Sequence, residues 1–96
     1  MLQYLITALD GNDTSALDRR LSVRPDHFKK ARELKASGNF VTGGAILDDD
    51  GKMKGSMMVL QFNSEQELKE WMDNEPYILG KVWQQIEVRP FKVADV

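Results

Sequence analysis

The sequence has 96 residues, of which 42% are hydrophobic and 29% are charged, with 13 basic against 15 acidic residues and a formal net charge of −2. This length predicts one domain, residues 1–96, and the composition is typical of a globular protein. The balanced charge argues against a nucleic-acid partner, which would require a concentrated basic surface. The absence of cysteine excludes disulfides and thiolate chemistry. The N-terminal segment MLQYLITALD lacks the basic start of a signal peptide and is too short to span a membrane, so a cytoplasmic protein with no membrane partner is expected.

The first half of the chain predicts a strand, a helix and a second strand. Residues 2–9 are apolar on both parities, as in a strand that is covered on both faces. Within residues 25–37 apolar side chains recur at helical spacing, and Gly38 follows as a C-terminal cap. The only histidine, His27, would then lie in the first turn of this helix. Residues 39–47 predict the second strand.

The second half repeats this order. Residues 48–52 predict a hairpin turn, and residues 56–62 predict a third strand. Ser64 with Glu67 matches a capping box at the start of a second helix. The buried stripe of that helix would consist of Leu68, Trp71 and Met72. After a short turn around Tyr77, residues 85–92 alternate as a fourth strand, and the proline within it predicts a position at an edge or near a bulge.

The resulting order, β-α-β-β-α-β, predicts an α+β fold of the ferredoxin-like type. Both helices of such a fold cover the same face of the sheet, yet the third strand is apolar on both parities, with Met57 and Val59 on one side and Met58 and Leu60 on the other. A partner subunit that stacks its own sheet on the open face would cover these residues. We therefore expect a homodimer.

Several segments taken in order resemble the YciI-like family of small dimeric α+β barrel proteins. They are RLSVRPDHFKK, the glycine pair in FVTGG, the GS that opens the third strand, EPY at 75–77 and the closing EVRPFK. The resemblance implies a ferredoxin-like protomer that forms a sheet-to-sheet dimeric α+β barrel, as a homodimer or a higher oligomer. It also implies a cleft in which a histidine of the first helix meets an acidic residue, normally the aspartate of a D-P-Y motif.

Two positions depart from the family pattern. Glu75 stands where the family has aspartate, and the hairpin DDDGKMK is shorter than the usual proline-containing loop. The resemblance assigns His27 and Glu75 as a catalytic pair, in which the carboxylate would fix the tautomer of the imidazole. From the residues alone, a partly buried or an idle histidine remains the alternative for His27.

Other candidate residues would bind the substrate. Arg20 and Arg24 flank His27 and are suited to an anionic group, with solvation or pairing to nearby acids as the alternative. Ser56 and Tyr77 carry hydroxyl groups that either orient a substrate or serve in capping and packing. The adjacent residues Gly43 and Gly44 indicate a close backbone approach, either to a ligand at Gly44 or at a bulge.

These observations leave three functional hypotheses open. The first is a cofactor-independent lyase or isomerase that uses a His–carboxylate pair for proton transfer on a small anionic or cyclic organic substrate. The second is a non-catalytic ligand-binding or regulatory module, and the third is a purely structural dimer. No metal site is expected, because the consecutive acids Asp48, Asp49 and Asp50 lack the alternate spacing of a calcium loop and fit a solvated turn.

Overall fold

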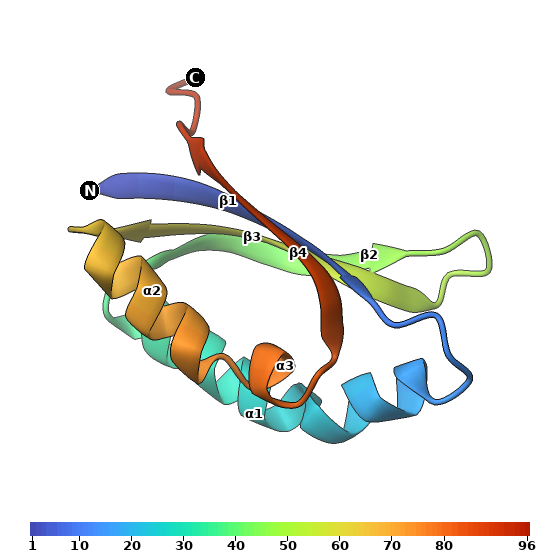
Figure 1. Cartoon of the computed structure of the whole chain (residues 1–96). Helices are drawn as coiled ribbons and strands as arrows, with labels where there is room; N and C mark the ends of the chain where they lie inside the picture. Colours follow the sequence, from blue (N-terminus) through green and yellow to red (C-terminus); the bar gives the residue numbers. More distant parts are fainter.

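The computed structural model describes all 96 residues and places four strands and three helices along the chain (Figure 1). In chain order the elements are β1 (Leu2–Asp10), α1 (Ala16–Ala36), β2 (Phe40–Leu47), β3 (Met53–Phe62), α2 (Glu65–Asn74), α3 (Pro76–Leu79) and β4 (Trp83–Phe91). The predicted β-α-β-β-α-β order is confirmed. The one-turn helix α3 lies where the sequence predicted only a turn.

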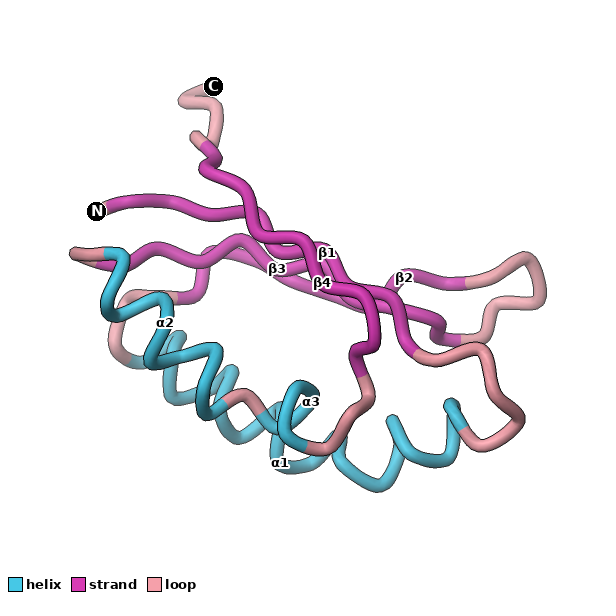
Figure 2. The backbone as a smooth tube through the Cα atoms, in the orientation of Figure 1, coloured by secondary structure: helices cyan, strands magenta, loops and turns pink.

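The strands form one antiparallel sheet with the order β2-β3-β1-β4. All three helices lie on the same side of this sheet, and no element of the chain covers the opposite side (Figure 2). This arrangement confirms the ferredoxin-like α+β fold. Pro90 lies in β4 at the edge of the sheet, which is the first of the two predicted alternatives, so its missing N–H removes no bond from the sheet interior.

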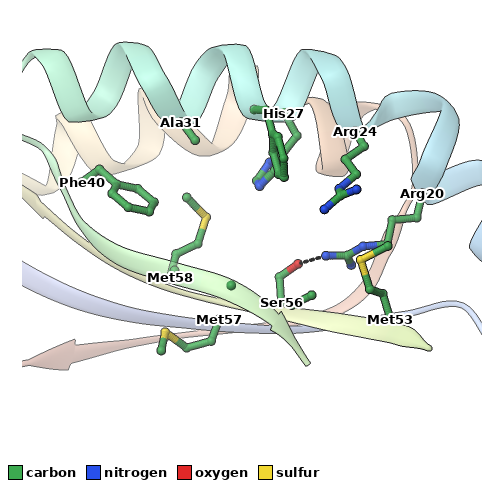
Figure 3. A pocket seen from close by; sticks show the side chains of 13 residues that line it. Arg20, Arg24, His27, Ala31, Phe40, Met53, Ser56, Met57 and Met58 are labelled. Atoms are coloured by element: carbon green, nitrogen blue, oxygen red, sulfur yellow. Dashed lines mark hydrogen bonds between the residues drawn. The ribbon is translucent and has the colours of Figure 1, made fainter. Parts of the chain in front are cut away.

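The core lies between the sheet and the helices, because alternate residues of the two central strands point toward the helices. From these strands Tyr4, Ile6, Ala8, Met58, Leu60 and Phe62 enter the core. Trp71 of α2, Tyr77 of α3, and Val82 and Trp83 at the start of β4 complete it. The predicted division of the third strand is therefore correct: Met58 belongs to the core, whereas Met57 points to the other side of the sheet (Figure 3).

Helix α1 differs most from its prediction, because it begins at Ala16 instead of Pro25. Proline is common in the first turn of a helix, but Pro25 lies exposed within α1. The buried residues of α1 are Ala16, Arg20 and His27. Because two of these three are polar, the apolar periodicity that reveals an amphipathic helix is missing from its first half. His27 consequently lies in the middle of α1, and its predicted place in the first turn is wrong.

Helix α2 begins as its sequence predicted. The backbone N–H of Glu67 donates to Ser64 Oγ at 3.3 Å, and the Glu67 carboxylate accepts from the N–H of Asn63 at 2.8 Å. Trp71 is its buried residue, with Leu68 and Met72 packed against the core, which confirms the predicted stripe. None of the helices is long and apolar enough to cross a membrane.

Candidate functional site

A cavity of about 210 Å³ lies between α1 and the strands β2 and β3. Figure 3 shows His27 and Arg24 reaching into it from the helix, with Ser56 and Met58 facing them from the sheet. Its lining residues are Arg20, Arg24, His27, Phe28, Ala31, Phe40, Gly43, Gly44, Ala45, Met53, Ser56, Met57 and Met58. The walls are thus largely apolar, and the lining contains no aspartate or glutamate.

His27 and Glu75 are in direct contact. Glu75 Oε1 is hydrogen-bonded to His27 Nδ1, and the same oxygen accepts the backbone N–H of Tyr77 at 3.2 Å. Glu75 is 1% exposed and His27 is 7% exposed. Glu75 ends α2 and caps α3, so the junction between these helices sets the position of the carboxylate. The structure therefore brings the predicted pair together, although Glu75 stands where the family has the shorter aspartate.

Two aromatic rings hold the imidazole plane. The Tyr77 ring stacks on His27 with a centroid separation of 3.9 Å and an interplanar angle of 10°. Trp83 approaches His27 edge-on at 5.8 Å. Rings packed in this way leave the imidazole little freedom to rotate. With Nδ1 engaged by Glu75, Nε2 is the ring nitrogen without a protein partner, and His27 lines the cavity.

Tyr77 differs from its prediction as a substrate-binding residue. It is fully buried, does not line the cavity, and its hydroxyl has no hydrogen-bond partner. Burial raises the pKa of Tyr77, because the phenolate would lose its hydration, and the nearby Arg20 opposes this shift only in part. Of the two alternatives for this residue, the structure shows packing.

Arg20 belongs to a buried polar network. Its Nη1 lies 3.1 Å from both carboxylate oxygens of Asp10, and its Nη2 donates to Ser56 Oγ at 2.8 Å. Trp83 Nε1 donates to the same Ser56 oxygen at 3.0 Å. Of the alternatives for Arg20, the structure thus shows pairing with a nearby acid. Both terminal nitrogens of its guanidinium are occupied within the protein.

Arg24 is the cationic side chain that remains available to a ligand. It lines the cavity, is half-buried and takes part in no salt bridge or hydrogen bond. Its guanidinium lies over the Phe28 ring, 4.6 Å from the centroid, which stabilises the cation at a modest level. An anion in the cavity would meet this charge.

The glycine pair lines the cavity from β2. The register of β2 against β3 shifts between Phe40 and Thr42, directly before the pair, which favours the bulge alternative. At Gly43 a Cβ atom would lie 3.0 Å from the Met57 carbonyl oxygen and 3.2 Å from the Phe40 ring, whereas Gly44 has open space around it. A ligand contact at Gly44 stays a prediction.

Sequence reasoning missed Asp10 and Trp83. Asp10 ends β1 and Trp83 opens β4, and these residues are paired across the sheet. A single acid at a strand end and a tryptophan in an apolar segment carry no pattern that connects them with Ser56. The antiparallel register, which is known once the strands are aligned, places Asp10, Ser56 and Trp83 near one another, and Arg20 reaches them from α1.

No group of three or more histidine, aspartate or glutamate side chains is arranged to hold a metal ion. The three consecutive acids of the hairpin form the predicted turn, in which the Asp48 carboxylate accepts the backbone N–H groups of Asp50 and Lys52, each at 2.9 Å. Gly51 adopts a φ of +80° there, a conformation that favours glycine.

Comparison with known proteins supplies relatives in sequence and in structure. The sequence model of the YCII-related domain matches residues 2–92. Protein YciI from Escherichia coli is 34% identical over 95 residues, which cover 93% of this chain and 95% of that protein. The structure of a 5-chloro-2-hydroxyhydroquinone dehydrochlorinase from Burkholderia phenoliruptrix, solved with 2,5-dihydroxybenzoquinone, matches with a TM-score of 0.81 and 24% identity, over 96% of this chain and 95% of that one. A dimeric ferredoxin-like protein of unknown function from Jannaschia matches with a TM-score of 0.60 and 14% identity, over 97% and 100% of the two chains.

The two solved structures support the fold alone, because their sequence identity to this chain is too low to carry a function across. The family match is stronger evidence of kinship, because it extends over almost all of the chain and is accompanied by a relative at 34% identity. The chain therefore belongs to the YCII-related domain family, as the resemblance of its motifs to YciI-like proteins had indicated.

Proposed function

We propose that the protein is a cofactor-independent lyase or isomerase in which His27 transfers a proton on a small anionic or cyclic organic substrate. The observation that carries this proposal is the engagement of His27 Nδ1 by the buried Glu75 while the residue lines the cavity. An ionised carboxylate only accepts hydrogen bonds, so Nδ1 carries the proton of the neutral ring. Nε2 then presents a lone pair toward the cavity and acts as a general base.

Glu75 has a second role in the proposed step. Once Nε2 takes a proton, the ring becomes a cation at a buried position. The adjacent carboxylate balances that charge, as in the carboxylate–histidine pairs of other proton-transfer enzymes. Tyr77 and Trp83 keep the ring in one orientation during this transfer.

The lining of the cavity supports the proposed class of substrate. Its apolar walls suit a flat or cyclic body, and Arg24 supplies a positive charge without a competing acid. The dehydrochlorinase that shares this fold was solved with a dihydroxylated quinone, which is a small oxygenated ring. A volume of about 210 Å³ is suited to a molecule of this size, below the range of drug-sized pockets.

We also propose that the protein is a homodimer through the open face of its sheet. Apolar side chains of β1 and β3 lie on this face, namely Leu5, Leu9, Met57 and Val59, and Leu5 is paired directly with Val59. No helix lies over this face (Figure 1). An apolar surface of this kind is unusual on a monomer. The dimeric ferredoxin-like protein from Jannaschia supports the idea that such a protomer can pair.

The proposed reaction is tested by screening lactones and hydroxylated aromatic acids for turnover. We expect His27→Ala to lower the rate about 10²- to 10⁴-fold, the typical contribution of a general base, and Glu75→Gln to lower it less, because glutamine keeps the hydrogen bond but not the charge. Lys29→Ala, an exposed position on the same helix, is the matched control and should retain full activity. Binding without turnover by the native protein would support the ligand-binding module instead.

A second measurement tests the site without any substrate. Because the chain contains one histidine, a long-range ¹H–¹⁵N NMR spectrum reports a single imidazole. We expect the neutral ring to carry its proton on Nδ1, where Glu75 accepts it. A ring protonated on Nε2 instead would contradict the proposed base.

A further inference from the structure

The hydroxyl of Ser56 is surrounded by donors. Arg20 Nη2 and Trp83 Nε1 both donate to Ser56 Oγ, and neither group can accept, since guanidinium and indole N–H groups are donors only. A serine oxygen has two lone pairs and one O–H. Both lone pairs are therefore occupied, and the hydroxyl proton must point in the remaining direction.

The cavity lies beside this hydroxyl. Ser56 is 3% exposed, lines the cavity and donates no hydrogen bond to any protein group. Figure 3 shows its oxygen on the helix-facing side of β3, on the same side of the sheet as His27 and Arg24. The proton of Ser56 is thus a donor without an acceptor within the protein.

We infer that Ser56, whose lone pairs are both occupied, acts toward a ligand only as a donor. Its hydroxyl binds a carbonyl oxygen of the substrate and stabilises the negative charge formed there, while His27 removes a proton from the adjacent carbon. This inference rests on the proposed function and narrows its substrates to enolisable ketones. Arg20, Asp10 and Trp83 are positioning residues that fix the direction of the Ser56 hydroxyl. The Arg20 cation polarises this hydroxyl, and such a charge strengthens the hydrogen bond that it donates.

The step is balanced without a further reactant. The C–H bond next to the carbonyl breaks, and its proton moves to His27 Nε2. The electron pair of that bond forms the C=C bond of an enolate, and the carbonyl π pair moves onto the oxygen, which accepts the Ser56 hydrogen bond. Donors held in place at a developing oxyanion lower the barrier because no reorganisation is needed when the charge appears.

Two buried acids thus hold the two groups that act in this step, the base and the hydrogen-bond donor. Glu75 holds His27, which takes the proton, and Asp10 holds Arg20, which directs the donor Ser56. The side chain of Asp10 is 3% exposed and that of Glu75 is 1% exposed. The lining itself has no acid that would compete with a substrate oxygen for the Ser56 proton.

The direction of the hydroxyl is tested by neutron diffraction from crystals grown in D₂O. We expect the Ser56 deuteron to point into the cavity, away from Arg20 and Trp83. A deuteron directed at an acceptor within the protein would overturn the inference. This result does not depend on any reaction of the protein.

The role in catalysis is tested with 4-oxocyclohexane-1-carboxylate, a cyclic ketone with a carboxylate suited to Arg24. Exchange of its α-hydrogens in D₂O is followed by ¹H NMR. We expect the native protein to accelerate the exchange and Ser56→Ala to lower the rate about 10²-fold, as for other oxyanion donors. Ser56→Thr keeps the hydroxyl and should retain part of the rate, and Ser22→Ala on the exposed side of α1 should retain all of it.

The failures of the two proposals are distinguishable. A folded Ser56→Ala variant that exchanges the probe at the native rate would overturn the role of Ser56 while leaving His27 as the base. No acceleration by the native protein would overturn the narrowing of the substrates to ketones, whereas the proton transfer proposed for His27 is tested separately with the lactones and hydroxylated aromatic acids.

Discussion

The imidazole of His27 is fixed by residues that have no polar function in the cavity. Glu75 holds one nitrogen, the Tyr77 ring covers one face and Trp83 meets it edge-on. The Tyr77 side chain takes part only through its ring, since its hydroxyl is buried without a partner. An unsatisfied buried hydroxyl costs roughly 1–3 kcal/mol. Removal of the Tyr77 hydroxyl should therefore not destabilise the fold.

We predict that Tyr77→Phe keeps the fold and raises the free energy of unfolding by up to about 1 kcal/mol, because it removes the unsatisfied group and keeps the stacked ring. Urea denaturation at neutral pH measures this change. A loss of more than about 1 kcal/mol would show that the hydroxyl has a partner in solution.

The pH dependence of Tyr77 has a definite sign. Burial raises the pKa of Tyr77 in the folded protein, whereas in the unfolded chain the phenol ionises near its usual value of about 10. Burial of the neutral Tyr77 side chain therefore contributes its full stability below the unfolded pKa. This contribution is lost as pH rises through the raised folded pKa, because the unfolded chain ionises first. We predict that unfolding curves from pH 9 to 11 show a steeper loss for the native protein than for Tyr77→Phe. Parallel curves would contradict this prediction.

Among the elements, α2 and α1 differ in what their sequences reveal. Helix α2 carries an N-cap serine and an apolar stripe, both of which are visible in the chain and present in the structure. Helix α1 places Arg20 and His27 on its buried face, so the residues that build the site also remove the apolar period of the helix. Its first half was unpredictable for that reason.

The candidate site divides in the same way. His27 and Glu75 were predictable through the motifs of the family, and their contact is present in the structure. The network of Asp10, Arg20 and Trp83 around Ser56 depends on strand register and on a long side chain that folds back from α1. Neither property is encoded in local residue patterns, so the direction of the Ser56 hydroxyl required the structure.

The N-cap of α2 can be tested directly by substitution of Ser64. We predict that Ser64→Ala lowers the free energy of unfolding by about 1 kcal/mol, because the N–H of Glu67 loses its acceptor. Ser64→Asp restores an acceptor and should recover most of the loss. Chemical denaturation of the two variants measures the difference. Equal stability of Ser64→Ala and the native protein would show that the cap contributes nothing.

The molecule as a whole is asymmetric, because one face of its sheet carries every helix and the other carries none (Figure 2). Along β3 the residues alternate between these faces. Met58 enters the core with 2% exposure, whereas Met57 is half-buried on the opposite face, where it pairs with Thr7 of β1 and Gly44 of β2. We therefore expect a lysine at position 57 to affect dimerisation and a lysine at position 58 to affect folding.

We predict that Met57→Lys dissociates the proposed dimer and leaves a folded protomer, whereas Met58→Lys unfolds the chain. In the first variant the lysine would be buried only by the partner subunit. Burial of an unpaired ion costs several kcal/mol, and dissociation of the dimer avoids this cost. In the second the charge lies in the core of each protomer, and separation brings no relief. Gln66→Lys adds the same charge on the exposed side of α2 and should change neither dimerisation nor folding.

Sedimentation equilibrium at micromolar concentration measures dimerisation in these variants, and near-ultraviolet circular dichroism measures folding. A monomeric native protein would overturn the proposed dimer, since nothing would then remain for Met57→Lys to dissociate.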